Sequence, residues 1–389
     1  MVKKRTVLIL VAHYLPGYKM GGPLTSIVNL VNTFSNEFDF SILTSDRDMG
    51  EAQPYPNLQG NTWLKISPNQ IYYVIRNLFS VINIIKQVRN TPYDVLYLNS
   101  FFEPFFSISV ILAAKCRIIK PQNIIIATRG ELLEEALNFK KRKKLIYLKF
   151  AEKLKLYENV SWHASTKIES ESIVNTLGVD SKKIHIALNL PNTSQNDFSS
   201  EHNDEENPTI DKQLKIVFLS RISKDKNVVY TLDVLNKVKA NVKFDIYGPI
   251  EDDYLWDICK EKIEQMPTNI EVSYHGSANR NDVKKILSHY DIFFLPTFAE
   301  NYGHAIAESL SVGTPVLISD RTPWRQLNNE NLGWDIALEN IDTFVATIED
   351  YALLSTEERA SKKESIRKTM EKRLLDPSIK EANRKLFNL

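Results

Sequence analysis

Residues 296–325 have the sequence PTFAENYGHAIAESLSVGTPVLISDRTPWR, and this stretch is the most informative part of the chain for predicting its fold and its binding site. It holds two carboxylates, Glu300 and Glu308, with seven residues between them. An apolar segment ends at Leu295 and an amphipathic segment begins near Gly303, which is the pattern of a strand followed by a helix. The start of a helix offers unpaired backbone N–H groups and the positive end of its dipole. We therefore expect a phosphate-binding helix start with carboxylates beside it that accept hydrogen bonds from hydroxyl groups.

The same alternation of strand and helix extends in both directions from this stretch. In the first half, strands are expected at 6–12, 38–43, 94–98, 123–127, 160–164 and 184–188, with helical segments that include 24–34, 70–88 and 131–157. In the second half, strands are expected at 215–219, 243–247, 271–274, 291–295 and 315–318. Alternation of this kind predicts parallel sheets covered by helices on both faces. The fold class is therefore α/β, with two Rossmann-like doubly wound domains that face each other across a ligand-binding cleft.

The polar, acidic segment 193–212 separates the two halves and has no periodicity, so we expect a linker or mobile loop there. It divides an N-terminal domain, 1–192, from a C-terminal domain, 213–375, and the segment 376–389 is expected to pack back on the N-terminal domain. Residues 1–190 contain 24 Lys+Arg and 15 Asp+Glu, a balance of +9, whereas the remainder contains 25 and 33, a balance of −8. The N-terminal half is thus expected to prefer anionic partners.

Composition points to a soluble globular protein, since 43% of the residues are hydrophobic and 25% are charged. The longest apolar run, 105–114, is too short to span a membrane. Cys116 and Cys259 are expected to be reduced core residues of a cytoplasmic protein. No nucleic-acid partner is expected.

Cationic side chains follow the first strand of the second half, where Arg221 and Lys226 lie five residues apart with Ser220 and Lys224 close by. A loop at the carboxyl end of a parallel strand points toward the ligand in such folds. Arginine grips phosphate with two N–H groups and lysine adds a point charge. We expect Arg221 and Lys226 to neutralise a diphosphate, although a solvated charged loop is the alternative.

Two further loops of the first half also follow strands. Gly21 and Gly22 allow close approach of the backbone to a ligand just before a helix, although a tight turn explains them equally well. Arg129 is a candidate for contact with an anionic acceptor or a leaving phosphate. Glu131 is a candidate for the same site or a carboxylate at a helix start.

Residues 140–155 contain eight Lys/Arg and one acidic residue among interleaved apolar side chains. A basic amphipathic helix of this kind lies on an anionic membrane surface, or else packs its apolar side on the core and leaves its charges in solvent. The sequence Asp46-Arg47-Asp48 reads as an acidic turn, so no metal site is assigned and no cofactor is expected.

Taken together, these residues resemble the family 4 retaining glycosyltransferases, which have the GT-B architecture of two facing Rossmann-like domains. The resemblance covers nearly the whole chain and is strongest over 214–334. The family's E-x7-E element matches Glu300 and Glu308, its arginine and lysine match Arg221 and Lys226, and its Gly-Gly matches Gly21 and Gly22. Segments 97–102, 129–131, 162–165 and 319–324 are similar to a subgroup linked with bacterial surface and capsular polysaccharides.

The resemblance implies roles for individual residues. Arg221 and Lys226 would hold the donor diphosphate, Glu300 with the backbone around Gly303 and His304 would hold the transferred sugar, and Glu308 would contact the ribose. Glu300, Arg221 and Lys226 are the expected catalytic residues. Asn99, Arg129 and Glu131 are expected on the acceptor side. Arg129 stands where many family members carry a histidine, so the role of that histidine does not transfer to this chain.

The expected activity is metal-independent, retaining transfer of a sugar from a nucleotide-diphosphate sugar to a glycan acceptor. The acceptor is expected to be lipid-linked, in surface polysaccharide synthesis, with the enzyme cytoplasmic and peripheral at the inner membrane face. Two alternatives remain, a sugar-nucleotide epimerase or hydrolase of the same fold, and an inactive nucleotide-sugar-binding partner subunit.

Overall fold

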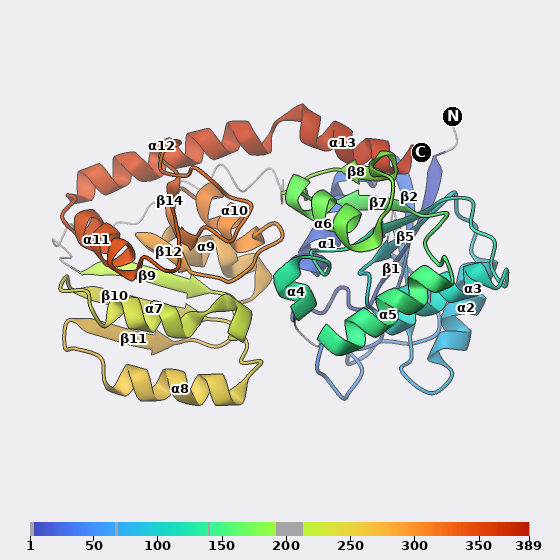
Figure 1. The fold of residues 1–389 in the computed structure, drawn as a ribbon, viewed down its shortest axis with the longest axis horizontal. Coiled ribbons are helices and arrows are strands. Elements are labelled where there is room, and N and C mark those ends of the chain that lie inside the picture. Colours follow the sequence, from blue (N-terminus) through green and yellow to red (C-terminus); the bar gives the residue numbers. More distant parts are fainter. Residues whose placement is uncertain (1–3, 67–68, 139–140, 192–212, 389) are drawn as a thin grey trace. The chain divides into compact units, whose positions relative to one another are not determined.

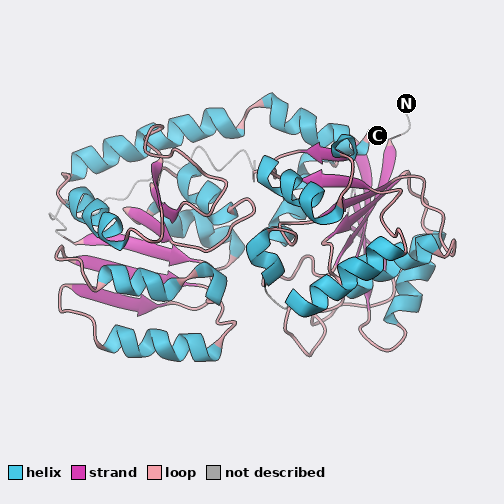
Figure 2. Cartoon of the chain, viewed as in Figure 1, coloured by secondary structure: helices cyan, strands magenta, loops and turns pink. Residues whose placement is uncertain are grey.

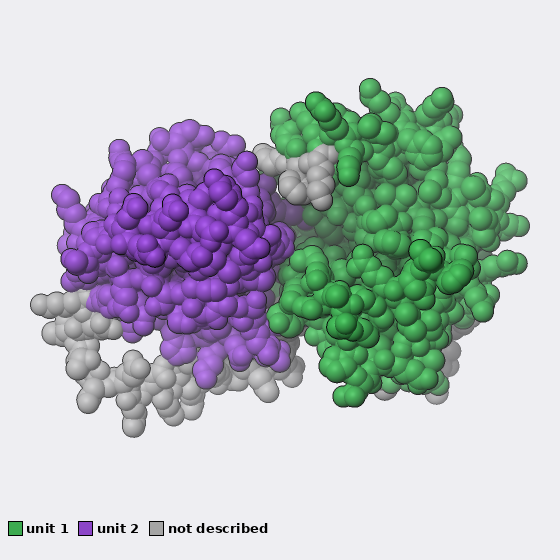
Figure 3. All heavy atoms as spheres, turned by 90° about the horizontal axis from the view of Figure 1, so that it is seen from below, with its two compact units in different colours: residues 1–193, 376–389 green, residues 194–375 purple. Residues whose placement is uncertain are grey.

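The computed structural model describes residues 4–66, 69–138, 141–191 and 213–388, and Figure 1 traces the chain. The expected linker, 193–212, and Lys140 at the start of the basic segment lie outside the described residues. The chain divides into two compact units, residues 1–193 with 376–389 and residues 194–375, which Figure 3 colours separately. Each unit is built on one sheet with helices packed against it (Figure 2).

The first unit contains an eight-stranded sheet in the order β3-β4-β2-β1-β5-β6-β7-β8. Its strands are β1 (Arg5–Val11), β2 (Phe38–Ser45), β3 (Trp63–Ile66), β4 (Asn69–Val74), β5 (Val95–Asn99), β6 (Ile124–Ala127), β7 (Ser161–Ala164) and β8 (Ile184–Ile186). Its helices are α1 (Gly22–Phe34), α2 (Ser80–Asn90), the π-helical turn η1 (Pro104–Ile108), α3 (Ser109–Lys115), α4 (Glu134–Asn138), α5 (Lys141–Lys153), α6 (Lys167–Leu177), the 3₁₀ turn η2 (Ser181–Lys183) and α13 (Pro377–Phe387). All paired strands are parallel except β3 and β4.

The alternating side chains of β1 explain why this sheet needs helices on both faces. Leu8 and Leu10 belong to the core cluster that α2, α3, α5 and α6 cover, whereas Val7 and Ile9 belong to the cluster that α1 and α13 cover. Successive residues of a strand point to opposite faces, so an uninterrupted apolar strand needs apolar partners on both sides.

The C-terminal helix α13 is part of the first unit although 182 residues of the second unit, 194–375, precede it in the chain. The ring of Phe387 lies 5.3 Å from the ring of Phe38 and 5.8 Å from that of Tyr97, measured between centroids. Arg384 donates to Glu37 at 2.6 Å from its Nε. Aromatic packing and an ion pair therefore hold the last helix against the first sheet.

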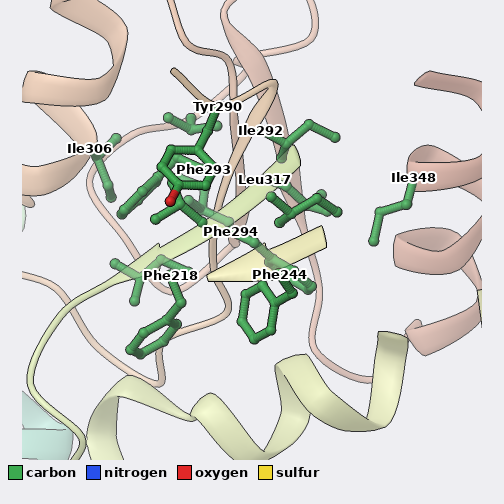
Figure 4. Close-up of a cluster of buried hydrophobic side chains, with 14 of the residues drawn as sticks. Phe218, Phe244, Tyr290, Ile292, Phe293, Phe294, Ile306, Leu317 and Ile348 are labelled. Atoms are coloured by element: carbon green, nitrogen blue, oxygen red, sulfur yellow. The ribbon is translucent and has the colours of Figure 1, made fainter. Parts of the chain in front are cut away.

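The second unit contains a six-stranded, all-parallel sheet in the order β11-β10-β9-β12-β13-β14. Its strands are β9 (Leu214–Leu219), β10 (Val242–Tyr247), β11 (Ile270–Tyr274), β12 (Ile292–Leu295), β13 (Val316–Ser319) and β14 (Gly333–Ile336). Its helices are the 3₁₀ turn η4 (Lys224–Lys226), α7 (Val228–Leu235), α8 (Asp253–Glu264), the 3₁₀ turn η5 (Arg280–Asp282), α9 (Val283–Ser288), α10 (His304–Ser311), α11 (Ile341–Ala352) and α12 (Thr356–Leu374). Figure 4 shows part of its core, where Phe218, Phe244 and Phe294 are fully buried between sheet and helices.

The α/β fold class predicted from the sequence is confirmed, and some local predictions are wrong. The expected helix 70–88 is a strand, β4, followed by the shorter helix α2, because the run Ile71-Tyr72-Tyr73-Val74 pairs with β2 and is buried there. The expected helix 131–157 is two described helices, α4 and α5. Cys259 is buried as expected, but Cys116 is exposed at the end of α3. In the part of the chain that the structure describes, no helix has both the length and the apolar character that crossing a membrane requires.

Candidate functional site

The central feature of the second unit is a pair of neighbouring loops at the carboxyl edge of its sheet. One follows β9 and the other follows β12, and these two strands pair in parallel. Thr297 Oγ1 and the backbone N–H of Phe298 both donate to the carbonyl of Asp225, at 2.8 Å each. Asn227 Nδ2 donates to the carbonyl of Pro296 at 3.0 Å. These bonds hold the two loops in a fixed relation to each other.

Lys226 and Glu300 meet across these two loops. Lys226 Nζ lies 2.5 Å from Glu300 Oε1 and 3.4 Å from Asp225 Oδ2. The side chains of Lys226 and Glu300 are only 10% and 17% exposed. The structure therefore brings together two of the three residues that the sequence analysis names as catalytic.

Arg221, the third of these residues, lies at the start of the loop that follows β9. Its guanidinium donates twice to Glu251, at 2.9 and 2.7 Å. Burial lowers the pKa of Arg221, but Glu251, Asp225 and Glu300 outweigh this and raise the pKa above its usual value. The side chain is 36% exposed, so an anionic ligand can reach it.

The loop after β12 ends at Gly303, and helix α10 begins at His304. Gly303 has φ 78°, in the left-handed region that favours glycine, and a β-carbon there would lie 2.8 Å from Ile306 Cδ1. The indole N–H of Trp324 donates to the carbonyl of Tyr302 at 2.6 Å and fixes the entry to the helix. In the first turn of α10, the backbone N–H groups have no partner within the helix, as at every helix start. The structure thus places a helix start a few residues after Glu300.

Glu308 lies on α10, one turn after His304. Burial raises the pKa of its carboxyl group to about 7, although Arg280 and Lys284 act in the opposite direction. Its ionisation is thus shifted toward neutral pH, where a modest change in surroundings converts it from hydrogen-bond donor to acceptor.

Gly21 and Gly22 belong to the first unit, where they form the start of helix α1. Gly21 has φ 63°, and a β-carbon on it would meet nothing within 4 Å. Its conformation, rather than crowding, favours glycine, and the space above it is open.

The three residues expected on the acceptor side lie at the ends of β5 and β6 in the first unit. Arg129 donates to Asn99 Oδ1 at 2.6 Å, to Asn189 Oδ1 at 2.7 Å and to the Tyr97 hydroxyl at 3.0 Å. Among the described residues, the buried Nδ2 of Asn99 has no hydrogen-bond partner. An unpaired buried donor of this kind calls for a water molecule or a ligand atom.

The hydrogen bonds of Glu131 give this residue a structural role. Its carboxylate accepts from the Ser100 hydroxyl at 2.7 Å and from the backbone N–H groups of Phe101 and Phe102 at 2.6 and 2.9 Å. It joins the loop after β6 to the loop after β5. This geometry gives no support to a role in acceptor binding, which stays a prediction.

Two features, Gly248 and a small hollow in the first unit, were not predicted from the sequence. Gly248 has φ 146°, and a β-carbon on it would lie 1.8 Å from the carbonyl oxygen of Ser220, which directly precedes Arg221. The hollow has a volume of about 200 Å³, and His13, Arg76 and Glu103 are among its lining residues. Burial raises the pKa of Glu103 above its usual value.

The acidic turn at Asp46 and Asp48 is occupied by hydrogen bonds from the protein. Asp48 accepts from the backbone N–H groups of Tyr18 and Met49 at 2.9 and 2.8 Å, and Asp46 accepts from the side chain of Arg47 at 2.9 Å. Across the described ranges, no group of three or more His, Cys, Asp or Glu side chains is arranged to hold a metal ion.

Comparison with known proteins identifies the class to which this fold belongs. Residues 199–369 match the family model described as "Glycosyl transferases group 1". The two α/β sheets match solved GT-B glycosyltransferase structures over nearly the whole chain. The chain therefore has the GT-B fold, and its residues 199–369 are similar to the group 1 glycosyltransferases.

The individual relatives have low sequence identity to this chain. An uncharacterised 41.2 kDa protein of the cps region of Klebsiella pneumoniae is 24% identical over 337 residues, which cover 86% of this chain and 87% of that protein. The crystal structure of WaaG, a glycosyltransferase involved in lipopolysaccharide biosynthesis, aligns with a TM-score of 0.71 at 13% identity and covers 98% of this chain and 99% of its own. HepE of Anabaena in complex with UDP-glucose aligns with a TM-score of 0.66 at 13% identity and covers 98% of each chain.

Proposed function

We propose that this protein transfers a hexose from a UDP-sugar to a glycan acceptor, with retention of the anomeric configuration and without a metal ion. The observation that carries the proposal is the contact between Lys226 and Glu300 beside the start of α10. It joins a buried cation, a carboxylate and a helix start, the groups that a diphosphate and a sugar ring require. The choice of uridine is supported by the similarity to a structure that holds UDP-glucose.

In the proposed reaction, Arg221, Lys226 and the start of α10 bind the donor diphosphate. Glu300 accepts hydrogen bonds from the sugar, assisted by the backbone at Gly303 and His304, and Glu308 accepts from the ribose hydroxyls. The bond between the anomeric carbon and the diphosphate oxygen breaks as the acceptor oxygen attacks from the same face. The diphosphate leaves with the electron pair and takes the acceptor's proton. Cations and the helix dipole stabilise the negative charge that builds on it.

The acceptor site belongs to the first unit in this proposal. Asn99 offers an unpaired buried N–H group, and Arg129 lies beside it, at the same edge of the sheet as Gly21, Gly22 and the hollow near Arg76. Hydroxyl-rich acceptors need such donors and acceptors of hydrogen bonds. The similarity to a protein of the cps region of Klebsiella pneumoniae supports a surface polysaccharide as the product.

Helix α5 supports a lipid-linked acceptor and a peripheral position at the cytoplasmic membrane face. Leu145, Ile146 and Phe150 are 44%, 70% and 48% exposed, and they alternate with Lys141, Lys149 and other cations. The alternative, in which the apolar side of this segment lies in the core, accounts only for Ala151 and its partly buried neighbours. Exposed apolar side chains among cations suit an anionic membrane surface.

A sugar-nucleotide epimerase or hydrolase would need Glu131 or His13 as its acid–base group. The three hydrogen bonds to Glu131 argue against that role. His13 Nδ1 lies 3.0 Å from the carbonyl of Arg47, which fixes its ring in the turn.

The test is to incubate the full chain with a panel of nucleotide sugars, with and without a membrane extract, and to follow the fate of the sugar. Transfer to an extractable lipid, lost in Glu300→Ala with an unchanged circular dichroism spectrum, is the expected result. Isomerisation or hydrolysis of the donor instead of transfer would favour the epimerase or hydrolase. Nucleotide binding with no turnover of any donor would favour an inactive partner subunit.

A further inference from the structure

The first unit contains a second, larger hollow, at the opposite edge of its sheet from the candidate acceptor residues. It has a volume of about 810 Å³ and is lined by the connection from α2 to β5 and the connection from α3 to β6. Both connections enter the amino ends of parallel strands, whereas Asn99 and Arg129 follow the carboxyl ends of β5 and β6. A five-residue strand spans about 17 Å, so this hollow is separate from the proposed transfer site.

Three cations line this hollow, Arg89 from the end of α2 and Arg117 and Lys120 from the connection between α3 and β6. All three are exposed, and none of them forms an ion pair with a described residue. The lining contains one carboxylate, Asp94, and its Oδ2 accepts from the backbone N–H and the hydroxyl of Thr6 at 2.8 and 2.9 Å. The positive charge of the hollow is therefore left for a ligand.

The backbone of Arg117 has an unusual conformation. It adopts φ 58°, in the left-handed region, directly after Cys116, the residue that caps the C-terminus of α3. Glycine or asparagine usually occupies such a position, and another residue there costs about 1 kcal/mol. Arg117 lines the hollow together with Arg89 and Lys120.

The remaining lining is mostly apolar or aromatic, with Thr91 and Gln122 as its two polar residues. Val88 and Ile119 are buried in the core, Tyr93 is partly buried, and Ile118 is 54% exposed. Arginine side chains bind phosphate oxygens with two N–H groups at once.

We propose that this hollow is a second anion site, which binds the phosphate or diphosphate group of a ligand other than the sugar donor. The excess of positive charge over residues 1–190, 24 Lys+Arg against 15 Asp+Glu, raises the local concentration of such ligands. The phosphate comes either from a free metabolite or from a lipid headgroup. The proposal does not depend on the sugar-transfer activity.

The test measures inorganic pyrophosphate binding by calorimetry on the full chain. The donor site is first weakened by Arg221→Ala and Lys226→Ala, so that the remaining heat reports on the second site. In this background the expected stoichiometry is one pyrophosphate per chain. Adding Arg89→Gln, Arg117→Gln and Lys120→Gln should weaken binding by about a hundredfold, the loss of several charge-assisted contacts.

A matched control neutralises three exposed lysines of the same unit that lie outside the hollow, Lys65, Lys86 and Lys182. The control should keep pyrophosphate binding within about twofold, since long-range charge is largely screened by salt. Equal losses in both triple variants would overturn the proposal, because they would reduce it to general electrostatic attraction. Absence of pyrophosphate and vesicle binding in the unaltered hollow would overturn it as well.

The source of the phosphate is decided by sedimentation with vesicles that contain phosphatidylglycerol, with pure phosphatidylcholine vesicles for comparison. Loss of sedimentation in the hollow variant, with binding retained in the lysine control, assigns the site to a lipid headgroup. Loss of pyrophosphate binding with unchanged sedimentation assigns it to a free phosphate. Both results support the anion site.

Discussion

Lys226 and Glu300 are 74 residues apart along the chain, and their side chains meet with 2.5 Å between Nζ and Oε1. The contact links the loop after β9 to the loop that precedes α10. The carboxylate balances the charge of a lysine whose side chain is only 10% exposed. We infer that a bound diphosphate replaces this carboxylate as the partner of Lys226. Glu300 is then available to the sugar, so binding of the donor also prepares the group that positions it.

Lys226→Ala should weaken UDP binding by at least about tenfold, which corresponds to the 1.5–3 kcal/mol typical of a charge-assisted hydrogen bond. The loss has two sources, because the variant removes a cation and leaves the charge of Glu300 close to the diphosphate. Isothermal titration calorimetry with UDP measures it. Lys224→Ala is the matched control, since Lys224 lies in the same loop and is exposed. Equal affinities of the two variants would remove Lys226 from the diphosphate site.

Glu308 predicts a pH dependence of nucleotide binding. Its pKa is raised to about 7 by burial, and only the ionised carboxylate accepts hydrogen bonds from both ribose hydroxyls. UDP affinity should therefore rise by about three- to tenfold between about pH 6 and pH 8. Calorimetry with UDP at several pH values in this range measures the affinity. Glu308→Gln should remove the pH dependence that the wild-type chain shows.

The same pKa predicts how Glu308 affects stability. In the unfolded chain the carboxyl group ionises near its usual pKa of about 4.3, while the folded chain keeps the proton up to about pH 7. The contribution to stability is thus fully present below about pH 4 and is lost as the pH rises through 7. We expect a change on the order of 2 kcal/mol, after allowance for partial exposure of the side chain. Urea unfolding of wild type and Glu308→Gln at several pH values isolates it, because other titrations cancel in the difference.

Gly248 directly follows the strand β10, and Gly248→Ala should disturb the neighbouring loop that contains Arg221. The new β-carbon would lie 1.8 Å from the carbonyl oxygen of Ser220, which belongs to the backbone and cannot move aside by itself. We expect a loss of about 3 kcal/mol or more in the free energy of unfolding, together with weaker UDP binding.

Gly276→Ala is the control for this prediction. Gly276 also has a positive φ, 71°, and its carbonyl accepts from the N–H of Gly248, but a β-carbon on it meets nothing within 4 Å. The free energy of unfolding of Gly276→Ala should fall by only about 1–2 kcal/mol, the usual cost of the left-handed conformation for a residue other than glycine. If the two variants unfold alike in denaturant, crowding at Ser220 is not what requires glycine at position 248.

Removal of metal ions should leave sugar transfer unchanged. In the proposed mechanism Arg221, Lys226 and the start of α10 stabilise the leaving diphosphate, which is the task of a divalent ion in metal-dependent transferases. Activity is compared before and after dialysis against EDTA, and again after Mg²⁺ or Mn²⁺ is restored. A strong loss that either ion reverses would contradict a metal-independent reaction.

Periodicity was sufficient to predict the fold class, because strands buried on both faces, such as β1 and β12, are continuous apolar runs. It failed for β4 and the antiparallel edge strand β3. The polar residues that flank these short strands resemble the polar face of a helix. Only strand pairing, of β4 with β2 and of β3 with β4, decides between strand and helix. Cys116 is exposed because α3 ends at the surface, and sequence spacing cannot reveal that.

Only some features of the candidate site could be predicted from the sequence. Local patterns were enough to indicate the helix start at Gly303 and the cations after β9, since each lies within a few residues of its strand. The hydrogen bonds that join Asp225 to Thr297, and the close approach of Gly248 to Ser220, connect segments far apart in the chain. Such contacts follow from the order of strands in the sheet. No feature of the local sequence distinguishes Gly248 from a glycine in an ordinary turn.

The exposed apolar side chains of helix α5 predict that this helix binds anionic membranes. Ile146→Ser with Phe150→Ser should reduce binding to phosphatidylglycerol vesicles strongly, because each exposed side chain contributes about 2 kcal/mol when it enters the membrane interface. The free energy of unfolding should fall by only about 1–2 kcal/mol, because Ile146 is 70% exposed and Phe150, at 48%, is half-buried. Vesicle sedimentation and thermal unfolding measure the two effects.

The control is Ile168→Ser with Leu353→Ser, which removes two apolar side chains that are 51% and 85% exposed on other elements. It should bind vesicles like the wild type, whereas a reduction equal to that of the α5 variant would mean that apolar exposure in general, and not this helix, governs the interaction. Raised salt should weaken wild-type binding further, since the cations of α5 attract the anionic headgroups over a distance of about one Debye length. A variant that retains full vesicle binding without Ile146 and Phe150 would place the membrane contact elsewhere on the chain.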